Sequence, residues 1–291
     1  MCCLAARCAQ TLPHLVLRAY RQVIINAIAI TPEDHASAED RLGLAIYPRA
    51  AMLNHACAPN VAASFEGSRL LIRAITDLVP GTVLRFCYGP QVGESIREVR
   101  RRQLMEQYHF WCRCSACEAS DLAAQEAASV GLKCGACDGA LIPSIRAPAG
   151  VCSLQQLPAN LQGSGTCFSC GTRMAAEEQA ERMARLSQAD AAYNRACSLL
   201  SQTGVVSAEA INLMGSCLKV QEDLLAPNNQ VLGRTHDALA RAHAQHGDAD
   251  RARMHAQRGL AIVSANYGDR HHVTQHQRSR LEATLRSVPR Q

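Results

Sequence analysis

The chain has 291 residues, of which 48% are apolar, 19% are charged and 4% are aromatic, and its formal net charge is +5. These values fit one or two packed domains and exclude a wholly disordered or collagen-like chain. The charge is too small to indicate a nucleic-acid-binding module, so the densest basic group is expected to be a solvated helix face: Arg97, Arg100, Arg101 and Arg102.

The first predicted element is an amphipathic helix within residues 12–30. Its apolar residues recur at helical spacing: Leu12, Leu15, Val16, Ala19, Val23 and Ala27. Charged and polar residues interrupt this stretch, so it is too polar to cross a bilayer. No charged leader with an apolar core and a cleavage site precedes it. We therefore expect a soluble protein in a reducing compartment, without a membrane partner.

Residues 54–88 carry a loop motif between short predicted strands. The motif reads Asn54-His55-Ala56-Cys57-Ala58-Pro59-Asn60. A hairpin is predicted at residues 61–65 and 70–74, with its turn at Glu66 and Gly67. A Leu-Val-Pro-Gly turn at 78–81 then leads into a predicted strand at 82–88, and a helical run rich in Arg and Glu follows.

The chain contains 15 cysteines, and most of its chemical information lies in two groups of them. Clustered cysteines in a reducing compartment are typical of zinc sites. The first group, Cys112, Cys114 and Cys117, supplies three thiolates. Because structural zinc is four-coordinate, this group requires a fourth ligand from elsewhere in the chain.

The second cysteine group consists of two Cys-x-x-Cys knuckles, formed by Cys134, Cys137, Cys167 and Cys170. Four thiolates complete the tetrahedral shell that structural zinc prefers. The Pro-, Gly- and Ser-rich segment 143–165 separates the knuckles, and Cys152 within it is expected to be a bystander. Such a closed site would stabilise the fold without taking part in chemistry.

From residue 175 onward the sequence predicts five helices, at 175–200, 207–225, 232–246, 248–267 and 273–288. Asp248 is expected to cap the fourth helix, and residues 239–259 follow a degenerate tetratricopeptide spacing. The histidines of this region are expected to be solvated or half-buried rather than to bind a metal: His236, His243, His246, His255, His271, His272 and His276.

Taken in order, these motifs resemble the SET-domain lysine methyltransferases, in the form of the SET-and-MYND-domain subfamily. Residues 54–60 resemble the Asn-His-x-Cys-x-Pro-Asn signature, and residues 107–117 resemble the post-SET zinc segment. The resemblance implies that Cys57 completes the first zinc site with Cys112, Cys114 and Cys117. The helical tail resembles the carboxy-terminal domain of the same subfamily. The expected location is the nucleus and cytoplasm.

The resemblance also implies an activity, the transfer of a methyl group from S-adenosylmethionine to a lysine of a protein substrate. Tyr88 would be the catalytic residue, because its phenol would lie beside the methyl group and orient the amine. The implied cofactor-binding residues are Asn54, His55, Tyr88 and Phe110, and the implied residues of the lysine channel are Ile28 and Tyr108.

The sequence departs from the family pattern in three places. Thr82 and Val83 replace two acidic residues of a Gly-Glu-Glu turn, and Ala56 replaces a serine of the signature. The early Gly-x-Gly segment and the MYND finger have no counterpart in the sequence. The resemblance therefore implies a carboxy-terminal portion that carries half of the cofactor pocket, with impaired activity.

Together these observations predict an α+β protein in three parts. They are a partial SET domain with its post-SET zinc segment at 1–120, an inserted zinc ribbon at 121–174 and a helical, tetratricopeptide-like domain at 175–291. The favoured function is an S-adenosylmethionine-dependent protein-lysine N-methyltransferase with two structural zinc ions. The alternative is a non-catalytic, zinc-stabilised scaffold that binds a protein or peptide through its helices.

Overall fold

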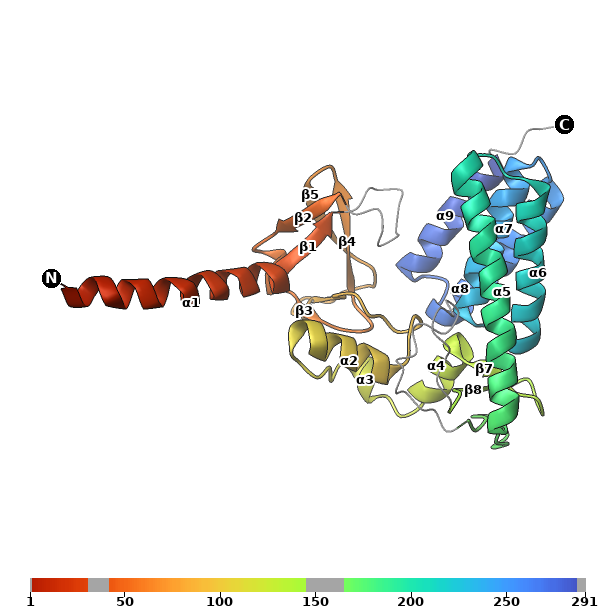
Figure 1. Ribbon diagram of the computed structural model, residues 1–291, viewed down its shortest axis with the longest axis horizontal. Coiled ribbons are helices and arrows are strands. Elements are labelled where there is room, and N and C mark those ends of the chain that lie inside the picture. The colour runs from red at the N-terminus through yellow and green to blue at the C-terminus, as the bar shows by residue number, and fades with distance from the viewer. Residues whose placement is uncertain (1, 31–41, 145–164, 287–291) are drawn as a thin grey trace. The chain divides into compact units, whose positions relative to one another are not determined.

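The computed structural model describes residues 2–30, 42–144 and 165–286 (Figure 1). The chain divides into two compact units: residues 1–89 with 103–112 form the first, and residues 90–102 with 113–291 form the second. Helix α2 (Arg97–Tyr108) contributes residues to both. None of the described helices combines the length and the apolar character that a membrane span requires.

The described residues of the first unit form one long helix and three two-stranded sheets. Antiparallel pairs join β1 to β2 and β4 to β5, and a parallel pair joins β3 to β6. The bounds are α1 (Cys2–Asn26), β1 (Ala27–Ile30), β2 (Gly43–Ile46), the short 3₁₀ helix η1 (Ala50–Met52), β3 (Asn54–His55), β4 (Val61–Glu66), β5 (Arg69–Ala74) and β6 (Arg85–Phe86).

The predicted hairpin at 61–74 is confirmed. Glu66 pairs with Arg69, and the intervening turn uses Gly67 at φ +58°, a left-handed conformation that glycine adopts without steric cost. Val61 and Phe65 lie an even number of residues apart, so both side chains point to the same face, where they are buried.

Helix α1 contains the predicted amphipathic segment and ends at Asn26, so Ala27 and Ile28 belong to β1 instead. Its apolar face remains open, since Leu15 and Val16 are 62% and 63% exposed.

The strand predicted at 82–88 is wrong in length, because only Arg85 and Phe86 form β6. The side chain of Asn60 explains the difference. Its Oδ1 accepts a hydrogen bond from the Arg85 amide at 2.7 Å, and its Nδ2 donates to the Val83 carbonyl at 3.0 Å. These side-chain bonds take up backbone groups that a longer strand would use in its ladder.

The second unit combines a small ribbon segment, built on one antiparallel pair of strands, with a helical bundle. Its elements are α3 (Ser115–Glu118), α4 (Leu122–Val130), β7 (Leu132–Lys133), β8 (Ala140–Leu141), α5 (Ala176–Thr203), α6 (Ala208–Leu224), α7 (Gln230–Gln245), α8 (Ala249–Tyr267) and α9 (His272–Arg286). Figure 1 shows α5 to α9 lying side by side, and each contacts the next. The five helices predicted from residue 175 onward are confirmed within a few residues, while 287–288 and Cys152 lie outside the described residues.

One apolar core joins the ribbon segment to these helices. Leu132 and Leu141 of the antiparallel β7–β8 pair are fully buried in the same cluster as Leu186, Leu224 and Leu239. Helix starts follow the expected capping chemistry, because the side chains of three N-cap residues accept hydrogen bonds from backbone amides: Ser207, Asn229 and, as predicted, Asp248.

Two predictions about polar residues in the second unit are wrong. Arg100 is fully buried rather than solvated, because its Nη1 pairs with Glu126 of α4 at 2.6 Å and also donates to the Ser95 carbonyl. His236, His243 and His255 are also buried, between α7 and α8. Helix crossing explains the burial: a Cβ on Gly259 would lie 3.3 Å from the Gly233 carbonyl oxygen, so the two helices approach closely enough to enclose the imidazoles.

Candidate functional site: a cavity beside Tyr88 and two cysteine centres

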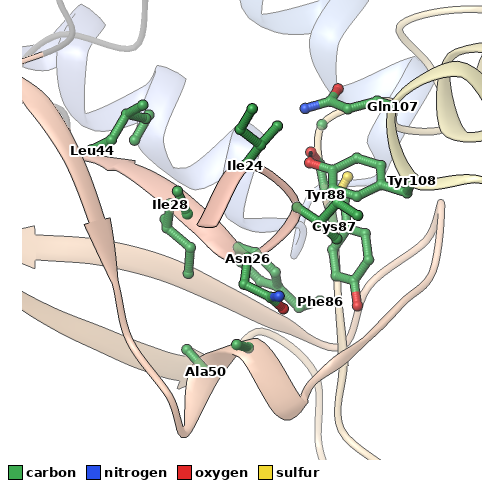
Figure 2. A pocket seen from close by; sticks show the side chains of 15 residues that line it. Ile24, Asn26, Ile28, Leu44, Ala50, Phe86, Cys87, Tyr88, Gln107 and Tyr108 are labelled. Atoms are coloured by element: carbon green, nitrogen blue, oxygen red, sulfur yellow. Dashed lines mark hydrogen bonds between the residues drawn. The ribbon is translucent and has the colours of Figure 1, made fainter. Parts of the chain in front are cut away.

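A cavity of about 490 Å³ lies within the first unit. It is enclosed by the end of α1, the β1–β2 pair, η1, the segment after β6 and the last turn of α2 (Figure 2). The residues labelled in Figure 2 are Ile24, Asn26, Ile28, Leu44, Ala50, Phe86, Cys87, Tyr88, Gln107 and Tyr108. Most of these side chains are aliphatic or aromatic, as is usual for a small-molecule or cofactor site.

Two tyrosines fix one wall of the cavity. The Tyr108 hydroxyl donates to the Tyr88 carbonyl oxygen at 3.1 Å, and the ring centroids lie 4.9 Å apart. The Tyr88 hydroxyl donates to the Leu53 carbonyl oxygen at 2.6 Å. Burial raises the pKa of both phenols above the ordinary value of tyrosine. Both phenols are therefore protonated at neutral pH and held as hydrogen-bond donors.

Three further residues implied by the resemblance, Asn54, His55 and Phe110, lie close to Tyr88 or to the segment that carries it. Asn54 and His55 form β3, which pairs with Arg85 and Phe86 of β6 and so runs beside the segment that carries Tyr88. Phe110 packs edge-on against the Tyr88 ring, with centroids 6.3 Å apart and an interplanar angle of 84°. Asn54, His55 and Phe110 are not among the residues that line the cavity.

The His55 ring makes two polar contacts at once. Its Nδ1 accepts a hydrogen bond from the Tyr88 backbone amide at 3.1 Å, and its Nε2 lies 3.3 Å from the Cys57 sulfur. The residue is only 6% exposed.

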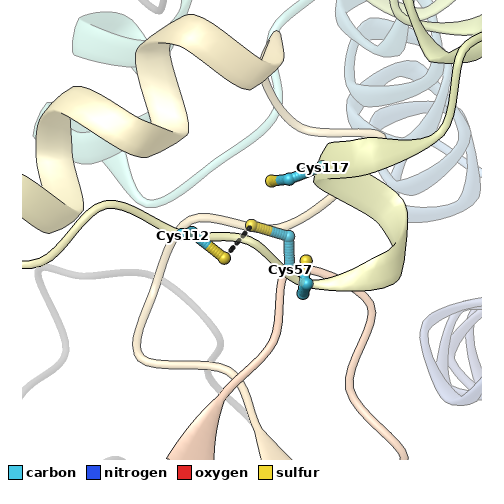
Figure 3. A group of neighbouring side chains, drawn as sticks. Cys57, Cys112 and Cys117 are labelled. Atoms are coloured by element: carbon cyan, nitrogen blue, oxygen red, sulfur yellow. Dashed lines mark hydrogen bonds between the residues drawn. The ribbon is translucent and has the colours of Figure 1, made fainter.

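The first cysteine centre consists of the four sulfur atoms of Cys57, Cys112, Cys114 and Cys117, which lie within 4.8 Å of one another. Cys57 and Cys112 are both buried, with their sulfur atoms 3.9 Å apart (Figure 3). Ligands of a tetrahedral zinc–thiolate site with bonds of about 2.3 Å are separated by about 3.8 Å. The observed separation therefore fits a zinc ion bound between the two sulfurs.

The second cysteine centre consists of Cys134, Cys137, Cys167 and Cys170, whose sulfur atoms also lie within 4.8 Å of one another. Two sulfur–sulfur distances, Cys134 to Cys170 at 3.8 Å and Cys137 to Cys167 at 3.6 Å, again match a tetrahedral edge. Hydrogen bonding with Thr172 lowers the pKa of Cys170 to about 6, which favours the thiolate that a metal requires.

Both predicted cysteine groups are therefore present, with Cys57 joining the first as the family resemblance implied, and each could bind one zinc ion. Backbone amides of Ala136, Gly139 and Ser169 point at the sulfurs of the second centre, the arrangement expected of metal-binding knuckles.

Comparison with known proteins finds homologues of the chain. No family model matches the chain. The chain is 29% identical over 266 residues to the protein-lysine N-methyltransferase SMYD4 of Mus musculus, a match that covers 87% of this chain and 30% of the relative. Shorter matches are the histone-lysine N-methyltransferase SMYD3 of Homo sapiens (37% over 106 residues, 36% of this chain and 23% of the relative) and a SET and MYND domain-containing protein of Dictyostelium discoideum (33% over 79 residues, 27% and 6%).

The chain is a homologue of the SET-and-MYND-domain methyltransferases. The family expected from the motifs is thereby confirmed. The chain spans about 30% of the length of the SMYD4 relative, so the activity of a whole SET-and-MYND protein is not transferred to it directly.

Of the site residues implied by the family resemblance, the cavity brings together Ile28, Tyr88 and Tyr108. The roles of all the implied residues stay predictions. Sequence reasoning missed Asn26, Cys87 and Gln107, which also line the cavity. Each lies one or two positions before an implied residue in the chain, and this adjacency was the only signal available to find them.

Proposed function

We propose that this chain forms part of an S-adenosylmethionine-dependent protein-lysine N-methyltransferase and that the cavity beside Tyr88 is its site of methyl transfer. The observation that carries the proposal is the meeting of Ile28, Tyr88 and Tyr108 on one cavity of about 490 Å³ in a chain whose homologues are lysine methyltransferases. This volume lies in the range of roughly 300–1,000 Å³ that small-molecule sites occupy.

Bound S-adenosylmethionine supplies a methyl group on a positively charged sulfur. The phenol of Tyr88 donates its proton to the Leu53 carbonyl, and the His55 backbone amide hydrogen-bonds its oxygen. The oxygen has two lone pairs, so the second could accept a hydrogen bond from the attacking amine. Such a bond would orient the amine for in-line attack. The aliphatic wall at Ile28 would favour the uncharged amine, because burial disfavours an ammonium.

The same proposal assigns two structural zinc ions to the two cysteine centres. Cys57, Cys112, Cys114 and Cys117 would bind the first ion, and Cys134, Cys137, Cys167 and Cys170 the second. Four thiolates leave no open coordination position, so these ions would stabilise the fold and not act on substrate.

The cofactor assignment is tested by calorimetric titration of the zinc-loaded chain with S-adenosylmethionine. We expect micromolar binding that the Asn54→Ala variant loses, because Asn54 is proposed to hold the cofactor. Asn194→Ala, on the exposed face of α5, is the matched control and should bind like the unmodified chain.

A folded, zinc-replete chain that does not bind the cofactor would overturn the proposal. The remaining candidate would then be a scaffold whose helices α5 to α9 contact a protein or peptide, and partner capture with the whole zinc-loaded chain as bait would test it. In the proposed enzyme the same helices would contact the protein substrate, and the location would be the nucleus and cytoplasm.

A further inference from the structure

His55 connects the first cysteine centre to the residue proposed to act in methyl transfer. All three residues concerned, His55, Cys57 and Tyr88, belong to the first unit. The buried His55 ring lies between the Cys57 sulfur, 3.3 Å from Nε2, and the Tyr88 amide, 3.1 Å from Nδ1.

These two contacts define the tautomer of the ring. A backbone N–H can only donate, so Nδ1 carries a lone pair and the ring proton of a neutral imidazole sits on Nε2. Nε2 then donates to the Cys57 sulfur, and a metal-bound thiolate is a good acceptor for it. Both contacts are satisfied together when Cys57 is a thiolate, which is the form that zinc requires.

Tyr88 hydrogen-bonds to residues 53–55 through both its backbone amide and its phenol. Its amide donates to His55, and its phenol donates to the Leu53 carbonyl oxygen at 2.6 Å. The centroid of the Tyr88 ring lies 5.3 Å from that of the His55 ring, with the two planes tilted by 53°, and the Ala56 amide donates to the Phe86 carbonyl oxygen at 2.9 Å. A shift of residues 53–57 would therefore move both the backbone and the phenol of Tyr88.

We propose that His55 is a positioning residue, which transmits the metal-bound state of Cys57 to Tyr88 through its Nε2–H and Nδ1. The relevance of this link to catalysis rests on the proposed function, but the link itself does not. It gives the first cysteine centre a role beyond stability, because the metal would fix the orientation of a residue in the cavity wall.

Two substitutions each remove one of the two polar contacts that the His55 ring makes with Cys57 and Tyr88. In His55→Asn the side-chain carbonyl oxygen occupies the place of Nδ1 and keeps the acceptor for the Tyr88 amide, while the donor to Cys57 is lost. In His55→Gln the amide nitrogen reaches the place of Nε2 and keeps the donor to Cys57, while the acceptor for Tyr88 is lost. His236→Asn, a buried histidine of the second unit, is the matched control.

The first measurement is zinc release from the full, zinc-loaded chain to a chelator. We expect His55→Asn to release one of its two ions about 10–100-fold faster, because removing a hydrogen-bond partner of a metal ligand weakens binding by about that factor. His55→Gln and His236→Asn should release zinc at the rate of the unmodified chain. Unchanged release from His55→Asn would overturn the proposal.

The second measurement follows the Tyr88 amide by ¹H–¹⁵N NMR when cadmium replaces zinc, a change that lengthens the metal–sulfur bonds and keeps the chain folded. We expect the Tyr88 signal to shift in the unmodified chain and in His236→Asn but not in His55→Gln, where the link is cut. An equal shift in His55→Gln would mean that the metal acts on Tyr88 by another route and would overturn the proposal.

Titration with S-adenosylmethionine distinguishes this inference from the proposed function. If the unmodified chain binds no cofactor while its Tyr88 signal responds to the metal through His55, the proposed function fails and the link stands. If the cofactor binds equally well to the unmodified chain and to both His55 variants, the link has no part in the site and its catalytic relevance is overturned.

Discussion

The two units of this chain are stabilised by different means. The first unit has strands of two to six residues and an exposed apolar face on α1, and it supplies Cys57 and Cys112 of the first cysteine centre. The second unit has five long helices around a continuous apolar core, into which its cysteine-bearing ribbon is packed. A unit with little apolar burial depends more on a bound metal than one with a large core. Metal loss should therefore affect the cavity more than the helices.

The largest expected effect is the loss of the first cysteine centre. Cys112→Ser should leave one zinc ion per chain and abolish cofactor binding, because structural zinc sites contribute on the order of 10 kcal/mol to folding. Metal analysis and calorimetric titration measure the two effects. Cys197→Ser, an exposed cysteine of α5, is the control and should keep both ions. A Cys112→Ser chain that still holds two ions would contradict the ligand assignment.

Loss of the second cysteine centre should affect the helical unit and not the cavity. Cys137→Ser should also leave one zinc ion per chain and should lower the melting temperature of the helical unit. Cofactor binding should survive, because every residue that lines the cavity belongs to the first unit. Abolished binding in Cys137→Ser would show that the two units do not respond independently to metal loss.

A smaller effect is expected from the buried ion pair in the second unit. Arg100→Met leaves the Glu126 carboxylate, 5% exposed, without its cation and should cost about 3–5 kcal/mol of unfolding free energy. Burial already raises the pKa of Glu126 despite the charge of Arg100. Urea denaturation measures the loss. The double variant Arg100→Met with Glu126→Met should recover most of it, and a double variant as unstable as the single one would contradict the ion-pair explanation.

Sequence reasoning predicted the helical part of the fold well and the first unit less completely. Periodic apolar spacing and caps such as Asp248 are local signals, so the positions of α5 to α9 followed from them. The length of β6 depends on Asn60, 25 residues away from Arg85, and no local pattern shows that contact.

For the candidate site, the order of the motifs predicted which segments of the chain form it, but not the contacts that their side chains make. The spacing of cysteines predicts the second centre and three ligands of the first, because four ligands per zinc is a chemical constraint that sequence alone can apply, whereas Cys57 followed only from the family resemblance. The family resemblance assigns His55 to the cofactor, whereas in the structure its ring accepts a hydrogen bond from the Tyr88 amide and lies 3.3 Å from the Cys57 sulfur. The burial of three histidines was missed because the close approach of Gly233 and Gly259 is a tertiary feature.

The smallest expected effect is a loss of stability of the helical unit at low pH, caused by these buried histidines. Burial, followed by the nearby His255 and Arg258, lowers the pKa of His236 to about 4, and burial also lowers the pKa values of His243 and His255. In the unfolded chain a histidine has a pKa of about 6.5. The unfolded state therefore binds more protons below this pH, so stability present above pH 6.5 is lost as the pH falls toward 4.

For His236 alone this loss is on the order of 3 kcal/mol, and Glu222, 3.7 Å from its Nε2, should reduce it by pairing with the protonated ring. Urea denaturation at pH 7 and pH 5 measures the change in unfolding free energy. His236→Leu should make the helical unit less sensitive to pH in this window, whereas the exposed variant Cys197→Ser should leave the sensitivity unchanged. An equal loss of stability in His236→Leu would place the acid-sensitive groups elsewhere. Because these imidazoles lie between α7 and α8, acid should loosen the helical unit first, the reverse of the order expected for metal loss.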